Sequence, residues 1–192
     1  MHKEILSTAA IALTFVLFFP YIRSIRRGET KPHVFSWFIW GLGTLIVFCA
    51  QLAGHGGIGA WPIGVSGLIT SYIALLAYLK RSDSSITRTD WAFLLTALSA
   101  LPFWFVTSDP LWTVVILTTA DLVGFGPTFR AAYRRPHDER IWFFALAAAR
   151  NLLVILALEH YSLTTALFPA AVGLACMVLA VLIAYRRHAL LN

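Results

Sequence analysis

Seven long apolar runs, separated by short polar segments, constrain the fold of this chain more than any motif does. A membrane-spanning helix needs about 20 mostly apolar residues. Runs of this length therefore predict helices that cross a bilayer. Hydrophobic residues make up 59% of the 192 residues and charged residues 12%, against about 25% charged in soluble domains. We expect an all-α integral membrane protein with seven transmembrane helices, at 5–22, 34–53, 58–79, 91–106, 111–129, 141–158 and 163–185.

Two of the runs have features that argue against a membrane-spanning helix of the mature chain. The run 91–106 is the shortest of the seven and contains Pro102. The run 5–22 has the length of a signal peptide, but its basic cluster follows the apolar residues and no small-residue cleavage site is evident. We expect both runs to form helices of the mature chain.

The basic residues predict the orientation in the membrane. Alternate connections contain Lys and Arg, and the connections between them, "GHGG", "SDP" and "EHYS", contain none. Basic loops stay on the cytoplasmic side, so we expect the amino terminus outside and the carboxyl terminus in the cytoplasm of a plasma or bacterial inner membrane. The net charge of +6 is explained by this topology, and we expect no nucleic-acid partner. The basic positions are Arg23, Arg26, Arg27, Lys31, Lys80, Arg81, Arg88, Arg130, Arg134, Arg135, Arg140, Arg186 and Arg187.

The chain contains an internal repeat. One constant shift places Pro20 on Pro127 and Arg23 on Arg130, and the same register returns at Pro62 and Pro169. The shift spans four helices, so both copies enter the membrane in the same direction. We expect a first three-helix repeat at 1–82, a linker helix at 83–108 that inverts the direction, and a second three-helix repeat at 109–192. Parallel repeats of this kind place a substrate site at their interface, near the midplane.

Two segments carry a family resemblance: "FFPYIRSIRRGETKPHVFSWFIW" in the first copy and "GFGPTFRAAYRRPHDERIW" in the second. In both, a proline near the end of the first helix precedes a basic loop, and a tryptophan follows early in the next helix. The chain resembles the SWEET and PQ-loop superfamily of sugar, amino-acid and nicotinamide riboside transporters and retrieval receptors. The resemblance implies two parallel three-helix bundles joined by an inversion linker helix.

The resemblance leaves the substrate and the oligomeric state open. Tyr21 and Thr128 follow the two prolines, where the family has glutamine, so the subfamily is not defined. Relatives with a single repeat pair up to complete a bundle, whereas this chain already holds two repeats. The chain therefore needs no partner to complete a bundle, although the sequence leaves a homo-oligomer open.

Proline and glycine near the cytoplasmic edge predict a gate. Proline removes a backbone donor and kinks a helix, and Pro20 and Pro127 each stand three residues before an arginine. Gly124 and Gly126, where the first copy has Leu17 and Phe19, make this segment of the second copy more flexible than that of the first. The alternative is a static kink at each proline. We expect Pro62 and Pro169 to begin their helices.

Asp121 and Arg150 are charged residues within apolar runs. Asp121 lies nine residues from Arg130, and Arg150 lies ten residues from Arg140. At about 1.5 Å per residue both lie roughly 13–15 Å from the cytoplasmic edge, near the midplane. Consecutive helices are expected neighbours, so the two side chains could meet there. Such residues mark substrate or proton paths, and the alternative is an ion pair that joins the two helices.

Other polar and aromatic residues at similar depth are candidates for the same site. Trp37, near the loop, is expected to anchor at the membrane interface, and Trp40 lies deeper, where it could stack on a ligand. Single Ser and Thr residues often pack helices together, which is the alternative for each. The remaining candidates are Thr44, Ser66, Thr70, Thr118 and Asn151.

Enzyme and metal motifs are missing from the sequence. "GVSG" (64–67) lacks the spacing of a nucleophile elbow, and no phosphate loop or metal-ligand cluster occurs. We expect no enzyme, no metal and no cofactor. The predicted function is transport of a small polar or zwitterionic solute by alternating access. Asp121 and Arg150 would offer opposite charges to the solute, or Asp121 would carry a coupling proton. The rival is a membrane receptor or assembly factor of the same fold that binds its ligand without transport.

Overall fold

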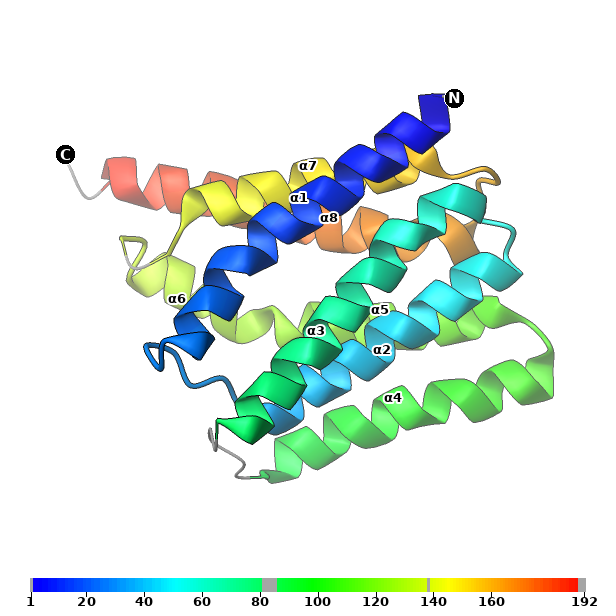
Figure 1. Ribbon diagram of the computed structural model, residues 1–192, viewed down its shortest axis with the longest axis horizontal. Helices are drawn as coiled ribbons and strands as arrows, with labels where there is room; N and C mark the ends of the chain where they lie inside the picture. Colours follow the sequence, from blue (N-terminus) through cyan, green and yellow to red (C-terminus); the bar gives the residue numbers. More distant parts are fainter. Residues whose placement is uncertain (1, 81–85, 138, 190–192) are drawn as a thin grey trace.

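The computed structural model describes residues 2–80, 86–137 and 139–189, and these residues form helices joined by short connections (Figure 1). Six segments are long and apolar enough to cross a membrane, and α7 is a shorter apolar helix. The chain therefore has the fold of a multi-pass membrane protein. Its elements are α1 (His2–Arg26), α2 (Val34–Ala53), the 3-10 helix η1 (Gly57–Ala60), α3 (Trp61–Leu79), α4 (Arg88–Thr107), α5 (Pro110–Gly124), α6 (Gly126–Arg134), α7 (Ile141–Ala157) and α8 (Leu163–Ala189).

The helices begin and end close to the predicted apolar runs. The run 34–53 coincides with α2, and the run 141–158 exceeds α7 by one residue. The run 111–129 differs, because the helix is interrupted at Phe125 and continues as α6. The predicted boundary between residues 82 and 83 lies outside the described residues.

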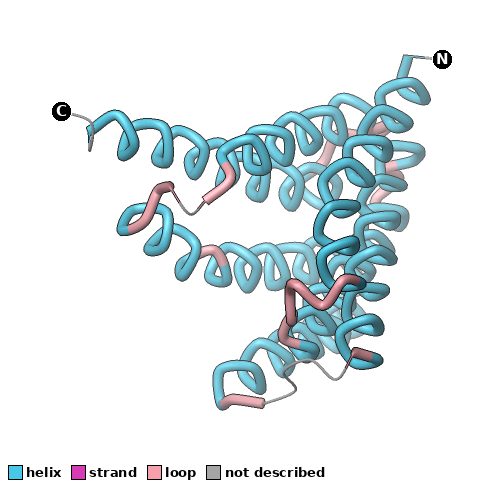
Figure 2. Tube along the Cα trace, turned by 60° about the vertical axis from the view of Figure 1, so that its left-hand side comes forward, coloured by secondary structure: helices cyan, strands magenta, loops and turns pink. Residues whose placement is uncertain are grey.

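The helices pack as two sets of three with the same internal order. In the first set α3 contacts both α1 and α2, and in the second α8 contacts both α5 and α7. Figure 1 labels these helices, and Figure 2 shows the same bundle from a second side. The expectation that the helices of Asp121 and Arg150 are neighbours is therefore wrong, because α8 packs between α5 and α7. The two sets meet through α1 with α7 and through α2 with α5, while α4 packs against α5 and α2.

Small residues allow α2 and α3 to pack closely. A Cβ on Gly41 would lie 3.0 Å from the backbone nitrogen of Ser71, and a Cβ on Gly67 would lie 2.9 Å from the Leu45 side chain. Gly64 packs in the same way against the ring of Phe48. The glycines of "GVSG" thus serve helix packing, as small residues commonly do in membranes.

The two copies of the proline segment differ in structure. Pro20 lies inside α1, which continues to Arg26, whereas Pro127 stands in the first turn of the separate helix α6. Pro62 stands in the first turn of α3, as predicted. Pro169 lies inside α8, six residues after its start at Leu163, so the expectation that it begins the helix is wrong.

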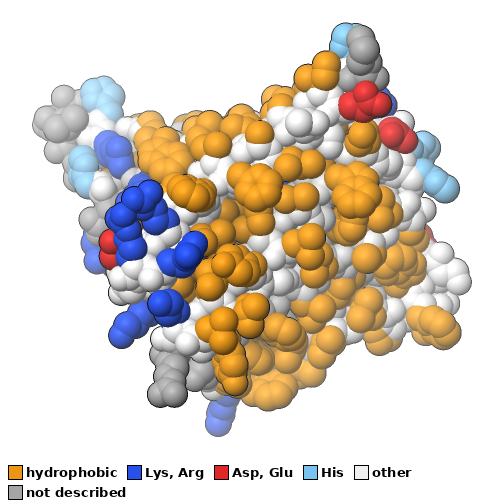
Figure 3. All heavy atoms as spheres, viewed as in Figure 1, with side chains coloured by type: hydrophobic (Ala, Val, Ile, Leu, Met, Phe, Trp, Pro, Cys, Tyr) orange, Lys and Arg blue, Asp and Glu red, His pale blue; other side chains and the backbone are white. Residues whose placement is uncertain are grey.

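Charged and apolar side chains divide the surface into zones. Figure 3 shows Lys and Arg gathered at the end where α6 and the last turn of α8 lie, beside a broad hydrophobic belt. We call this the basic end, and the end that contains η1 the opposite end. A hydrophobic belt between polar ends is the surface that a bilayer requires.

Candidate functional site

A cavity of about 390 Å³ lies between the two sets of helices. Seven of the eight predicted ligand-binding residues line it: Trp40, Thr44, Ser66, Thr70, Asp121, Arg150 and Asn151. The other lining residues are Leu17, Phe18, Trp37, Gly124, Phe125, Thr128, Phe143, Phe144, Ala147, Phe168, Val172 and Cys176. Candidates chosen by depth along separate helices therefore converge on one space.

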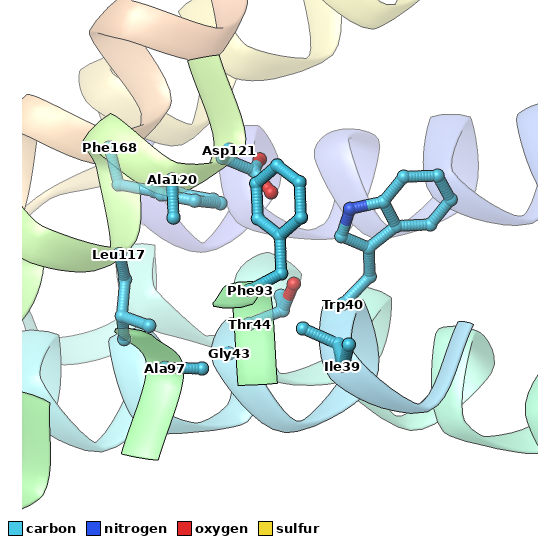
Figure 4. Close-up of a pocket in the computed structure, with 10 residues that line it drawn as sticks. All are labelled: Ile39, Trp40, Gly43, Thr44, Phe93, Ala97, Leu117, Ala120, Asp121 and Phe168. Carbon is cyan, nitrogen blue, oxygen red and sulfur yellow. The ribbon is translucent and has the colours of Figure 1, made fainter. Parts of the chain in front are cut away.

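A small hollow of about 20 Å³ continues the cavity between α2, α4 and α5. It shares Trp40, Thr44, Asp121 and Phe168 with the cavity. Figure 4 shows the Asp121 carboxylate and the Trp40 indole directed toward the same space, from α5 and α2. The hollow has room for about one water molecule.

Ten of the lining residues form five pairs that the shift of the sequence repeat relates to one another. Each pair takes one residue from the first set of helices and one from the second. The pairs are Leu17 and Gly124, Phe18 and Phe125, Trp37 and Phe144, Trp40 and Ala147, and Thr44 and Asn151. Equivalent positions of the sequence repeat thus face one cavity.

Arg150 is buried and bonded to neutral groups of the protein. Its Nε donates to Thr14 Oγ1 at 3.1 Å, its Nη2 donates to the Pro62 carbonyl at 2.6 Å, and its Nη1 donates to Asn151 Oδ1 at 3.1 Å. These bonds connect α7 to α1 and to the first turn of α3. Thr14 is the residue of the first repeat that corresponds to Asp121.

Asp121 lines the same cavity as Arg150, but no ion pair joins the two. Within the described residues, the Asp121 carboxylate has no hydrogen bond or ion pair with the protein. The alternative in which the pair joins two helices is therefore wrong. The physical reason is that α8 separates α5 from α7, while Thr14 and Pro62 lie within reach of the guanidinium.

Among the residues whose side chains the structure describes, three predicted site residues are not part of the cavity lining, and the side chain of the predicted gate residue Pro127 lies outside the described part. Thr118 is buried, and its hydroxyl has no hydrogen-bond partner among the described residues. Thr118 lies one helical turn from Asp121 on α5 but is absent from the residues that line the cavity, so its role as a ligand-binding residue stays a prediction. Pro20 and Gly126 of the predicted gate do not line the cavity either, whereas Gly124 does.

Aromatic side chains supply much of the lining, and sequence reasoning selected only Trp40 among them. Trp37 was expected only at the membrane interface, but it lines the cavity. Its ring stacks on that of Tyr21 with a centroid distance of 4.9 Å and meets the Trp40 ring edge-on with a centroid distance of 5.5 Å. The repeat register could have identified these aromatic residues, because it pairs Trp37 with Phe144 and Phe18 with Phe125, so that aromatic residues stand at equivalent positions of both repeats.

The cavity extends toward the basic end, where Phe18, Trp37, Thr128 and Phe143 line it. Toward the opposite end it stops at a packed layer of fully buried side chains, which comprises Ala10, Val47, Ala50, Ile63, Val154 and Ala157. We call this group the packed layer.

Hydrogen bonds beyond the packed layer tie the two sets of helices together. Gln51 Nε2 donates to the Thr165 carbonyl at 2.6 Å, and Lys3 Nζ donates to the Leu158 carbonyl at 2.6 Å. A Cβ on Gly59 would lie 2.5 Å from the backbone nitrogen of Leu158, so η1 and this segment are in direct backbone contact. The cavity is thus closed at the opposite end.

The fold and the cavity together define a multi-pass membrane protein with an internal cavity of small-molecule size. Among the described residues, no group of three His, Cys, Asp or Glu side chains is placed to hold a metal ion. The chain matches no protein-family model, no curated protein and no solved structure.

Proposed function

We propose that the chain is a membrane carrier that moves a small polar solute through the central cavity by alternating access. In this proposal seven helices span the membrane, with the amino terminus outside and the carboxyl terminus in the cytoplasm. The two repeats form parallel three-helix bundles, and α4 is the linker that inverts the direction of the chain between them. This is the arrangement of the SWEET and PQ-loop superfamily that the sequence resembles.

The observation that carries the proposal is the cavity lined by five pairs of residues at equivalent positions of the two repeats. A site at the interface of two repeats is typical of carriers that work by rocking one repeat against the other. The shared order of the helices supports the same arrangement, because the third helix of each set packs between the first and the second.

The uneven packing along the cavity supports alternating access. The packed layer closes the opposite end, while the cavity extends to the basic end. With basic segments on the cytoplasmic side, this is an inward-facing state. The outward-facing state requires that the packed layer separates and that the helices close at the basic end, where α6 follows the interruption at Phe125.

Transport is tested in two steps with the purified protein. A thermal-shift screen against sugars, amino acids, nucleosides and vitamins first finds solutes that stabilise it. Each solute found is then loaded radiolabelled outside proteoliposomes, and we expect saturable uptake that an excess of the unlabelled solute abolishes. Binding without uptake by any of these solutes contradicts the carrier and supports the receptor of the same fold.

The inward-facing state is tested through Cys176, which lines the cavity, whereas Cys49 is exposed on the surface of α2. In a Cys49→Ser variant, a membrane-impermeant thiol reagent should label Cys176 faster in inverted vesicles than in intact cells. A further Cys176→Ala variant controls for background. Faster labelling from outside contradicts the proposed orientation.

A further inference from the structure

The two charged residues of the cavity differ in how the protein satisfies them. Arg150 donates three hydrogen bonds to neutral acceptors from its own helix and two others, and its side chain is only 7% exposed. These bonds hold the guanidinium against the wall between α1 and α3. Arg150 therefore acts as a clamp between helices.

Asp121 is the opposite case. Its carboxylate faces the cavity and has no bond to the described residues of the protein. A carboxylate removed from bulk water is costly unless a cation or hydrogen-bond donors compensate it. Because no hydrogen-bond donor of the described residues reaches the carboxylate, we expect the donor or cation that satisfies it to come from the contents of the cavity.

The cavity that Asp121 faces is rich in aromatic rings. They come from both sets of helices and are Phe18, Trp37, Trp40, Phe125, Phe143, Phe144 and Phe168. The faces of such rings attract cations, tryptophan most strongly, and the attraction grows when water is excluded. Trp40 and Asp121 are directed toward the same space (Figure 4).

We propose that the ligand of the cavity is an organic cation, with a protonated amine or quaternary ammonium held by Asp121 and an apolar body held by the rings. This rests on the proposed function and narrows its solute from polar or zwitterionic to cationic. The cavity of about 390 Å³ is of the size that binds small molecules.

The basic residues at the mouth of the cavity do not prevent such binding. Arg130 is exposed and lies nine residues from Asp121, about 13 Å along the chain of α5 and α6. Arg150 lines the same cavity and keeps its charge, because its three acceptors are neutral. The ammonium group of the ligand therefore has to lie at Asp121, with the apolar body toward the guanidinium.

Four matched probes test the charge preference. They share a phenyl ring and differ in charge: 2-phenylethylamine is a cation, 2-phenylethanol is neutral, 3-phenylpropionate is an anion and phenylalanine is a zwitterion. Binding to the purified full-length protein is measured at neutral pH by saturable thermal shift and by tryptophan fluorescence. We expect the amine to bind most tightly to the wild type.

Variants of the protein test whether Asp121 causes the preference for the amine. Asp121→Asn should weaken amine binding by about tenfold or more, because it removes a charge-assisted bond, and should leave the affinity for 2-phenylethanol unchanged. Glu29→Gln, at an exposed carboxylate in the basic connection after α1, is the matched control and should bind the amine as the wild type does. Should Asp121→Asn fail to unfold cooperatively, Trp40→Leu provides the second test and should weaken the amine more than the alcohol.

Contrary binding results overturn the inference, and transport results separate its failure from that of the carrier. Equal affinity for the amine and the alcohol would mean that Asp121 carries a proton and not a ligand cation. Tighter binding of the anion or zwitterion would assign recognition to Arg150, and binding of none of the four probes would exclude small aromatic amines as ligands. Transport of some other solute that is independent of Asp121 would refute the cation inference and leave the carrier intact. Amine binding without uptake would refute the carrier and leave the inference intact.

Discussion

The bond between Arg150 and Thr14 gives a direct test of the helix clamp. Thr14 is fully buried on α1, and its hydroxyl accepts from Arg150 Nε at 3.1 Å while it donates to the Ala10 carbonyl at 2.8 Å. Thr14→Val keeps the shape of the side chain but leaves one buried guanidinium N–H without an acceptor. An orphaned buried donor costs about 1–3 kcal/mol, so we expect a loss of this size in the free energy of unfolding.

A double-mutant cycle separates the bond from other effects of the valine. In an Arg150→Met background no guanidinium is left to orphan, so Thr14→Val should change the stability by less than about 0.5 kcal/mol there. Stability is measured by equilibrium unfolding of the purified protein in SDS. Thr8→Val is the control, because Thr8 makes the same bond to the carbonyl four residues earlier on α1 but is exposed. An equal loss for Thr14→Val in both backgrounds would refute the clamp.

Two further predictions concern the packing around the cavity. Gly59→Ala should lower the free energy of unfolding by about 1–3 kcal/mol, because its Cβ would lie 2.5 Å from the backbone nitrogen of Leu158. Gly126→Ala is the control, because its Cβ would meet nothing within 4 Å. Equal effects of the two variants would argue against the close approach of Gly59 and Leu158. Thr118→Val should raise the stability by up to about 1 kcal/mol, because it removes a buried hydroxyl without a partner, and a loss above about 1 kcal/mol in the same unfolding assay would mean that the hydroxyl is bonded.

The sequence alone predicted the helices with small errors. Length and hydropathy are local properties, and a run such as 34–53 needs no tertiary partner to be recognised as a helix that can cross a membrane. The depths of Asp121 and Arg150 also follow from the position of each residue in its run and the constant rise of an α-helix. The sequence assigned similar depths to Asp121, Arg150, Trp40 and Thr44, and all four residues line one cavity in the structure.

Tertiary structure decided which side chains meet at that depth. Counting residues fixes the height of a side chain along its helix but not the lateral order of the helices or the direction in which the side chain points. The structure places α8 between α5 and α7, and so separates Asp121 from Arg150. Arg150 bonds instead to Thr14 and Pro62, which are 136 and 88 residues away in the chain. Asp121 is left facing the cavity because its expected partner is held by helices that no local pattern could identify.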